Sequence, residues 1–134
     1  MKVIDINHTD KTPEVIFDTE LREFRINGYS RPENIREFYV PILNTLQKEF
    51  SSIVSSGDTN LYSFHFQLEY YNSSSAKFIS DIIKVIKQYA DTGLHVSIFW
   101  YFDKDDDEMQ EAGEDFSSIS NIPFKYIAVY RLYL

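Results

Sequence analysis

The sequence predicts an α/β fold in which helices cover mainly one face of a mixed sheet. Strand-like and helix-like segments follow one another along the 134 residues in the order β-β-α-β-α-β-α-β. Strands joined through helices favour right-handed crossovers and locally parallel neighbours. The strands alternate apolar with polar residues, which indicates that one sheet face is covered and the other is open. No linker or repeat divides the chain, so residues 1-134 are expected to form a single domain.

Short strands open the predicted sheet. Residues Glu14–Asp18 and Glu23–Asn27 are strand-like and flank a short polar connection, a pattern that is typical of an antiparallel pair. A weaker strand is expected at Lys2–Ile6, before this pair.

The first predicted helix follows a change in the hydrophobic period. Apolar residues recur every three or four positions from Ile35 to Ile53, which is the spacing of one helix face. Ser30 and Glu33 fit a capping box, in which a hydroxyl caps the helix and a glutamate three residues later bonds back to the cap. Pro41 lies inside the stripe and removes one helical hydrogen bond, so a bend is expected there.

The rest of the chain alternates strands with helices. The predicted elements are a strand over Tyr62–Tyr70, a helix over Phe78–Ala90 that ends before Gly93, a strand over His95–Phe102, a helix over Glu108–Ser118 and a strand over Phe124–Leu134. Three strand-to-helix junctions should then lie at one sheet edge: Gly28–Asn34, Tyr71–Ser75 and Asp103–Glu108. Ligands of open α/β sheets bind beyond the carboxyl ends of the strands, so function is expected at this edge.

The composition argues against several classes of function. The formal net charge is −8 and clusters of Lys and Arg are lacking, which disfavours nucleic acid and anionic membrane surfaces as partners. The absence of cysteine excludes disulfides, thiolate metal sites and cysteine nucleophiles. No apolar signal-peptide core and no apolar run of ~20 residues occurs, so a cytoplasmic protein without membrane insertion is expected.

The sequence motifs give little sign of catalysis. His8, His65 and His95 are isolated along the chain, and neither a G-x-S-x-G motif nor a glycine-rich phosphate loop occurs. A protein without enzymatic activity, cofactor or metal is therefore expected.

An acidic run at residues 103–108 raises the question of calcium. Five acids fall at the first, third, fifth, ninth and twelfth positions of a calcium-binding loop: Asp103, Asp105, Asp107, Glu111 and Glu114. Glu108 occupies the sixth position, where the turn needs glycine, and a strand precedes the run in place of a helix. A solvated loop that enters a helix is the simpler interpretation, and tight calcium binding is not expected.

The most informative stretch is the junction Asn72-Ser73-Ser74-Ser75, between a strand and a helix. Backbone N–H groups and the positive end of the helix dipole favour negative charge at such a junction. Phosphorylation of a serine there would add about −1.5 to −2 charges at neutral pH. Asn and Ser are also preferred helix caps. The residues alone therefore leave two interpretations open, a regulatory phosphorylation site and a structural cap.

Three segments together resemble the SiaC-type regulatory phosphoprotein family of bacteria. They are Thr12–Val15 with Phe17-Asp18, Gly28–Asn34 with Phe38–Pro41, and Tyr71–Lys77. The resemblance implies a single STAS-like domain, similar to the anti-sigma-factor antagonists, without catalytic activity. It also implies a partner-switching protein kinase, a PP2C-type phosphatase, and an unphosphorylated form that binds and activates a diguanylate cyclase.

The resemblance also assigns site residues. The phosphoacceptor of the family directly follows the asparagine, a position that Ser73 occupies here. Ser73 is expected to precede the helix proper, with its hydroxyl exposed. Because the strand-to-helix junctions are expected to converge at one sheet edge, the residues expected to form the partner-binding surface around Ser73 are Glu33, Asn34, Asn72 and Ser74.

A second class of function stays open. The chain is 16% aromatic, and an aromatic sheet face could serve a constitutive scaffold or dimerisation module. Adjacent genes for a kinase, a PP2C-type phosphatase and a cyclase would favour the phosphorylation switch over the scaffold.

Overall fold

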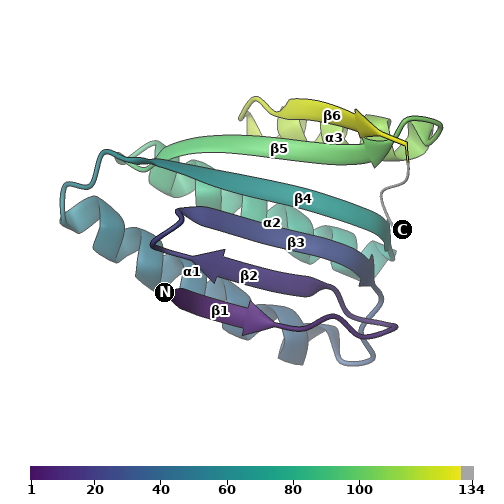
Figure 1. The fold of residues 1–134 in the computed structure, drawn as a ribbon, viewed down its shortest axis with the longest axis horizontal. Helices are drawn as coiled ribbons and strands as arrows, with labels where there is room; N and C mark the ends of the chain where they lie inside the picture. Colours follow the sequence, from purple (N-terminus) through teal and green to yellow (C-terminus); the bar gives the residue numbers. More distant parts are fainter. Residues whose placement is uncertain (131–134) are drawn as a thin grey trace.

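In the computed structural model, which describes residues 1–130, a six-stranded mixed sheet carries helices on one face (Figure 1). The elements in chain order are β1 Lys2–Ile6, β2 Glu14–Asp18, β3 Glu23–Ser30, α1 Ile35–Ser55, β4 Leu61–Tyr71, α2 Ser73–Ala90, β5 His95–Asp103, α3 Asp107–Ser120 and β6 Lys125–Val129. The predicted α/β class with helices on one sheet face is confirmed.

The strands lie in the sheet in sequence order, from β1 to β6. The pairs β1–β2 and β2–β3 are antiparallel, and the three pairs from β3 to β6 are parallel, as the helical crossovers predict. Three strands precede α1, one more than in the order β-β-α-β-α-β-α-β. The additional strand is β1, whose hydrophobic period is weak because Ile4 is its single buried residue.

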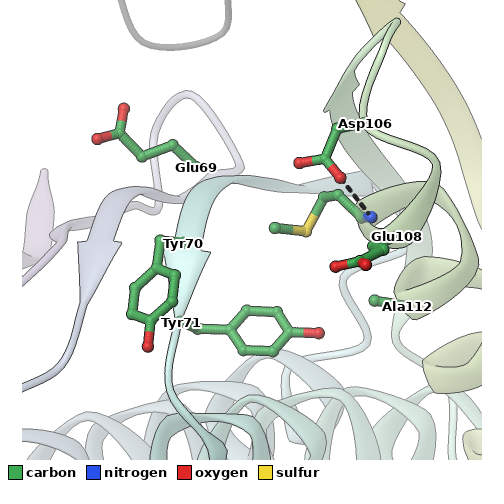
Figure 2. A pocket seen from close by; sticks show the side chains of 7 residues that line it. Glu69, Tyr70, Tyr71, Asp106, Glu108 and Ala112 are labelled. Carbon is green, nitrogen blue, oxygen red and sulfur yellow. Dashed lines mark hydrogen bonds between the residues drawn. The ribbon is translucent and has the colours of Figure 1, made fainter.

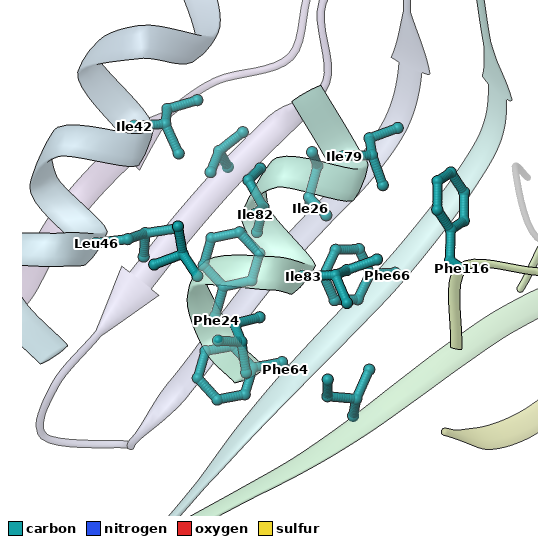
Figure 3. Packing of buried hydrophobic residues seen from close by; sticks show 14 of the residues in the cluster. Phe24, Ile26, Ile42, Leu46, Phe64, Phe66, Ile79, Ile82, Ile83 and Phe116 are labelled. Carbon is teal, nitrogen blue, oxygen red and sulfur yellow. The ribbon is translucent and has the colours of Figure 1, made fainter. Parts of the chain in front are cut away.

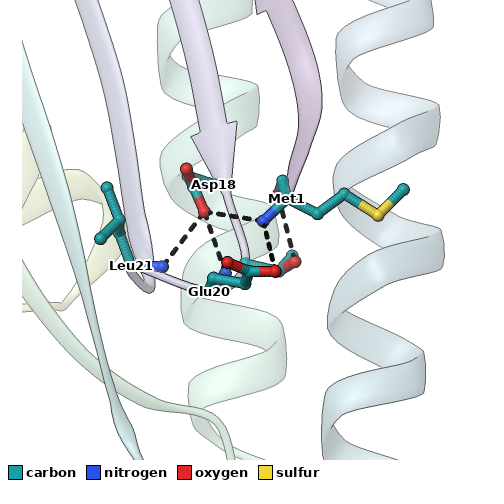
Figure 4. Close-up of polar contacts among 5 residues, drawn as sticks. Met1, Asp18, Glu20 and Leu21 are labelled. Atoms are coloured by element: carbon teal, nitrogen blue, oxygen red, sulfur yellow. Dashed lines mark hydrogen bonds and ion pairs between the residues drawn. The ribbon is translucent and has the colours of Figure 1, made fainter.

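The start of β1 is attached to the turn between β2 and β3 through one carboxylate (Figure 4). Asp18 lies 3.1 Å from the Met1 amino group and accepts hydrogen bonds from the backbone N–H groups of Glu20 and Leu21. The Leu21 N–H is the largest cause that holds the pKa of Asp18 below its ordinary value. The edge strand is therefore fixed at its N-terminal end by polar contacts.

The core lies between the sheet and the helices (Figure 3). Alternate residues of β4, including Phe64 and Phe66, are fully buried, so the aromatic face of this strand is its covered face. Helices α1 and α2 contribute Ile42, Leu46, Ile79, Ile82 and Ile83 to the same cluster. Each large apolar side chain that is fully buried contributes about 1.5–3 kcal/mol to folding.

The cap of helix α1 lies four residues after the predicted one. The Asn34 side chain caps it by accepting the Glu37 N–H at 3.1 Å, and it donates to the Glu37 carboxylate at 2.9 Å. Ser30 is instead the buried last residue of β3, and Glu33 forms a surface ion pair with Lys11 at 2.7 Å. The predicted Ser30–Glu33 capping box is therefore wrong, because pairing with β4 keeps Ser30 in the sheet.

Helix α3 packs directly on β5. The Trp100 indole N–H donates to the Met109 carbonyl at 2.9 Å, and a Cβ atom at Gly113 would lie 2.4 Å from the indole ring. Only glycine allows this approach of helix to strand. The last predicted strand, Phe124–Leu134, appears as the shorter β6, and residues 131–134 lie outside the described residues.

Candidate functional site

The first two predicted junctions lie side by side at one edge of the sheet. Ser30, at the end of β3, pairs with Tyr71 at the end of β4, and the Asn72 N–H donates to the Ser30 carbonyl at 3.0 Å. The residues that follow β3 and β4 therefore form one continuous region. This arrangement follows from the parallel pairing of the two strands, and it confirms the predicted adjacency.

The third junction meets this region across a cavity of about 330 Å³ (Figure 2). Residues from β4 and from the start of α3 line it: Glu69, Tyr70, Tyr71, Asp106, Glu108, Met109 and Ala112. Burial raises the pKa of Glu69 and is also the main cause of the raised pKa of Tyr71. Asp106 and Glu108 place carboxylates at the wall of this cavity, and their negative charges disfavour the binding of an anion there.

A second hollow, of about 270 Å³, lies where the chain enters α1. Its lining is Thr12, Pro32, Glu33, Asn34, Glu37 and Phe38. The hydrogen bond from Lys11 holds the pKa of Glu33 below its ordinary value. Two residues expected to contact a partner, Glu33 and Asn34, thus lie on a concave and exposed part of the surface.

Ser73 is the first residue of α2, and Asn72 is the cap. The Asn72 side chain accepts the Ser75 N–H at 2.8 Å, while its backbone is extended with φ −85° and ψ 174°. The expectation that Ser73 precedes the helix is therefore wrong, because the cap lies one residue earlier. The side chains of Ser73 and Ser74 are exposed, as predicted for the Ser73 hydroxyl.

Ser75 differs from its two neighbours because it is fully buried. Its hydroxyl donates to the Ser30 carbonyl at 3.0 Å and accepts from the Ser30 hydroxyl at 2.8 Å. The Tyr39 hydroxyl completes the network by bonding to the Ser30 hydroxyl. Burial raises the pKa of Tyr39 to about 12, so its phenol is neutral at physiological pH.

Sequence reasoning missed Tyr39 and Ser30 as parts of this region. Tyr39 lies on the apolar stripe of α1, where the sequence shows one more core aromatic. Ser30 matches a helix-capping pattern, which concealed its place in the sheet. A buried hydroxyl needs a hydrogen-bond partner. The hydroxyl of Tyr39 on an apolar helix stripe was therefore the one sequence signal that a polar partner lies nearby.

The acidic run after β5 enters a helix. Asp106 caps α3 by accepting the Met109 N–H at 3.0 Å, and Asp103 accepts the Asp105 N–H at 3.0 Å. Glu111 and Glu114 belong to α3 and not to a loop. Within residues 1–130, no three His, Asp or Glu side chains are grouped so that they could hold a metal ion.

The open sheet face has its own aromatic group on β4 and β5. The His65 ring stacks on Phe99 with centroids 4.9 Å apart, and its Nδ1 lies 2.8 Å from the Tyr101 hydroxyl. The helices cover Phe64 and Phe66 of β4, so these two rings are not available to an aromatic interface on the sheet. As far as residue 130, none of the helices is apolar over a length that would cross a membrane.

Comparisons with known proteins assign the family. The family model of the SiaC family regulatory phosphoproteins matches residues 6–129. An uncharacterized protein of Pseudomonas aeruginosa (strain UCBPP-PA14) is 26% identical over 124 residues, which cover 92% of this chain and 94% of that protein.

Solved structures share the fold. The apo-SiaC crystal structure from Pseudomonas aeruginosa has a TM-score of 0.81 and 23% identity, covering 96% of this chain and 99% of that chain. A chain in the structure of the diguanylate cyclase SiaD in complex with its activator SiaC, from the same organism, has a TM-score of 0.84 and 24% identity, covering 94% and 99%. The likeness to STAS domains stays a prediction. With its residues 6–129 matching the family model, the chain belongs to the SiaC family of regulatory phosphoproteins.

Proposed function

We propose that this protein is a non-catalytic partner switch whose binding to a diguanylate cyclase is controlled by phosphorylation of Ser73. The observation that carries the proposal is the exposed Ser73 hydroxyl on the first turn of α2, at the edge where the strand-to-helix junctions meet. Membership of a regulatory phosphoprotein family supports it. The cyclase is proposed as partner because SiaC of Pseudomonas aeruginosa is the activator of SiaD in their complex.

The first turn of α2 can accommodate a phosphate. The first four N–H groups of a helix have no acceptor within the helix, and the helix dipole favours an anion there. Lys77 follows Ser73 by four residues, so its exposed ammonium group lies on the same side of the helix. We therefore expect the fold to persist in both the phosphorylated and the unphosphorylated form.

The two forms differ in what a partner surface must accept. A surface fitted to a neutral Ser73 hydroxyl would have to bury about two negative charges after phosphorylation, which costs several kcal/mol if they stay unpaired. The carboxylates of Asp106 and Glu108 line the neighbouring cavity and add repulsion. The unphosphorylated form is therefore the one that binds the cyclase.

The residues around Ser73 supply two kinds of contact. Asn34 and Asn72 are helix caps, so they fix the shape of the surface. Glu33 and Ser74 are exposed and offer a carboxylate and a hydroxyl to a partner. A protein kinase of the partner-switching type and a PP2C-type phosphatase would act on the same exposed turn.

Cyclase activation tests the proposal. Each diguanylate cyclase encoded by the native host is purified, and cyclic di-GMP formation from GTP is measured with the unphosphorylated protein, Ser73→Ala and Ser73→Asp. The wild type and Ser73→Ala should activate one cyclase, and Ser73→Asp should not. Ser51→Asp places the same charge on an exposed serine of α1 and serves as the matched control.

Two results would contradict different parts of the proposal. Equal activation by Ser73→Asp and by the wild type would contradict control through Ser73. Activation of no host cyclase by the wild type would contradict the cyclase as partner.

A further inference from the structure

We propose that the buried hydrogen-bond network of Tyr39, Ser30 and Ser75 selects Ser73 as the phosphoacceptor among the three consecutive serines. The inference rests on the proposed function, because it assumes that this run of serines is phosphorylated. It assigns to Tyr39 and Ser30 a positioning role that acts through α2, without contact between these two residues and a kinase.

The network holds Ser75 in one orientation. Its hydroxyl is bonded to both the carbonyl and the hydroxyl of Ser30, at 3.0 and 2.8 Å. Its backbone N–H is bonded to the Asn72 side chain at 2.8 Å. The Ser75 side chain is 0% exposed. It therefore cannot turn outward without breaking two buried hydrogen bonds.

The direction of each hydrogen bond follows from the number of protons. Ser30 has one hydroxyl proton, which it donates to Ser75, so the Tyr39 hydroxyl must be the donor in the Tyr39–Ser30 bond. The proton of Ser75 goes to the Ser30 carbonyl. The chain from Tyr39 to Ser30 to Ser75 is thus satisfied at every step.

Tyr39 itself has little freedom. Its ring is stacked on Phe78 of α2 with centroids 5.4 Å apart and an interplanar angle of 8°, and it is 0% exposed. The same side chain thus contacts α2 through its ring and the end of β3 through its hydroxyl. The first turn of α2 is fixed to α1 and to the sheet at once.

Because both residues belong to α2, the direction of the Ser75 side chain determines the direction of the Ser73 side chain. Successive residues of an α-helix project about 100° apart around the helix axis. Measured from Ser75, Ser74 therefore lies about 100° away and Ser73 about 200° away. With Ser75 aimed at the sheet, Ser73 points almost directly away from it, and Ser74 lies on the flank. Ser73 is therefore the serine that a kinase reaches without contact with the sheet edge.

Loss of the network should weaken this selection. Without the Ser30 hydroxyl, the Tyr39 phenol and the Ser75 hydroxyl each lose a buried partner, and the first turn of α2 opens more often. In the open turn, Ser74 and Ser75 are presented together with Ser73. Phosphorylation should then be distributed over Ser73, Ser74 and Ser75.

Phosphosite mapping by mass spectrometry tests the inference. The wild type, Ser30→Ala and Tyr39→Phe, which all retain the three serines, are purified from the native host. The wild type should carry its phosphate on Ser73. In Ser30→Ala, the ratio of phosphate on Ser74 and Ser75 to phosphate on Ser73 should rise about five- to tenfold, the factor equivalent to one buried hydrogen bond. Tyr39→Phe leaves both hydrogen bonds of the Ser75 hydroxyl in place, so the ratio should rise by a smaller factor in this variant.

Two further variants separate positioning from stability. Ser30→Thr retains the hydroxyl and should restore the wild-type ratio. Gly113→Ala, which forces α3 against Trp100 and touches no member of the network, should leave the ratio unchanged. An unchanged ratio in both Ser30→Ala and Tyr39→Phe would overturn the inference while Ser73 remains the acceptor. Phosphate on other residues alone, or on none, in the wild type would overturn the proposed function and the inference with it.

Discussion

Ser30 and Ser75 are 45 positions apart in the sequence, and their hydroxyl oxygens are 2.8 Å apart in the core. The bond joins the end of β3 to the first turn of α2, so two neighbouring strand-to-helix junctions are fixed to each other by side chains as well as by the sheet. The exposed serines 73 and 74 are therefore carried by a turn whose inner side is rigid.

The three serines of the run should respond differently to truncation. Ser73→Ala should change the free energy of unfolding by less than about 0.5 kcal/mol, because Asn72 and not Ser73 is the cap. Ser75→Ala should cost about 1–3 kcal/mol, because it leaves the buried Ser30 hydroxyl without its acceptor. Urea unfolding, followed by Trp100 fluorescence, measures both values. Equal costs for the two variants would show that Ser75 has no special anchoring role.

The phenol of Tyr39 should make stability depend on pH in alkaline solution. Its pKa is raised by burial to about 12 from the ordinary value of 10. Between pH 10 and 12 the Tyr39 phenol is deprotonated in the unfolded chain and still protonated in the folded chain. Its contribution to the free energy of unfolding is therefore fully present below pH 10 and is lost as the pH rises toward 12. The loss attributable to Tyr39 is about 2 to 3 kcal/mol over this range.

Tyr39→Phe isolates this contribution. Burial also raises the pKa of Tyr62 to about 12, but Tyr62 titrates in both proteins and cancels in the comparison. The variant should lose less stability than the wild type between pH 10 and 12, although it is less stable by about 1 kcal/mol at pH 7 for lack of one hydrogen bond. Parallel pH profiles for the two proteins would contradict the assignment.

The corrected cap of α1 predicts a contrast between two adjacent residues. Asn34→Ala should cost about 1 kcal/mol, and Asn34→Asp should cost little because a carboxylate also accepts the Glu37 N–H. Glu33→Gln should leave stability nearly unchanged, since its exposed ion pair with Lys11 is the contact that it loses. Under the proposed function, Glu33→Gln should still weaken cyclase binding. Thermal unfolding and a binding titration with the activated cyclase check the two effects separately.

The elements with strong periodicity could be predicted from the sequence, and their ends could not. The stripe from Phe78 to Ile86 gave α2, because an apolar helix face is a local pattern. The predicted cap of α1 was wrong because two adjacent segments, Ser30–Glu33 and Asn34–Glu37, both match a cap with a glutamate three residues later. Pairing of β3 with β4 decides between them, and this pairing is not local.

The candidate site shows the same division. The position of Ser73 at a strand-to-helix junction could be inferred from the order of the elements. The distinction between Ser73 and Ser75 could not, because the inward direction of Ser75 depends on Ser30 and Tyr39, which reach it from other elements. Three equal hydroxyls in the sequence become one anchored and two exposed hydroxyls in the fold.

Gly113 should be intolerant of even the smallest side chain. In an exposed helix, Gly→Ala stabilises by about 1 kcal/mol, but here the new Cβ would lie 2.4 Å from the Trp100 ring. Gly113→Ala should therefore destabilise the protein by about 1–3 kcal/mol, the usual cost of overpacking a core. A double-mutant cycle with Trp100→Ala tests the cause, because it removes the ring atoms that the new Cβ would meet, and the cost of Gly113→Ala should then shrink or change sign. Trp100 is the one tryptophan of the chain, so the variants that lack it have no tryptophan fluorescence to follow. The unfolding of all four proteins in urea is therefore measured by circular dichroism. The same cost in both backgrounds would show that the close approach of α3 to Trp100 is not what requires glycine.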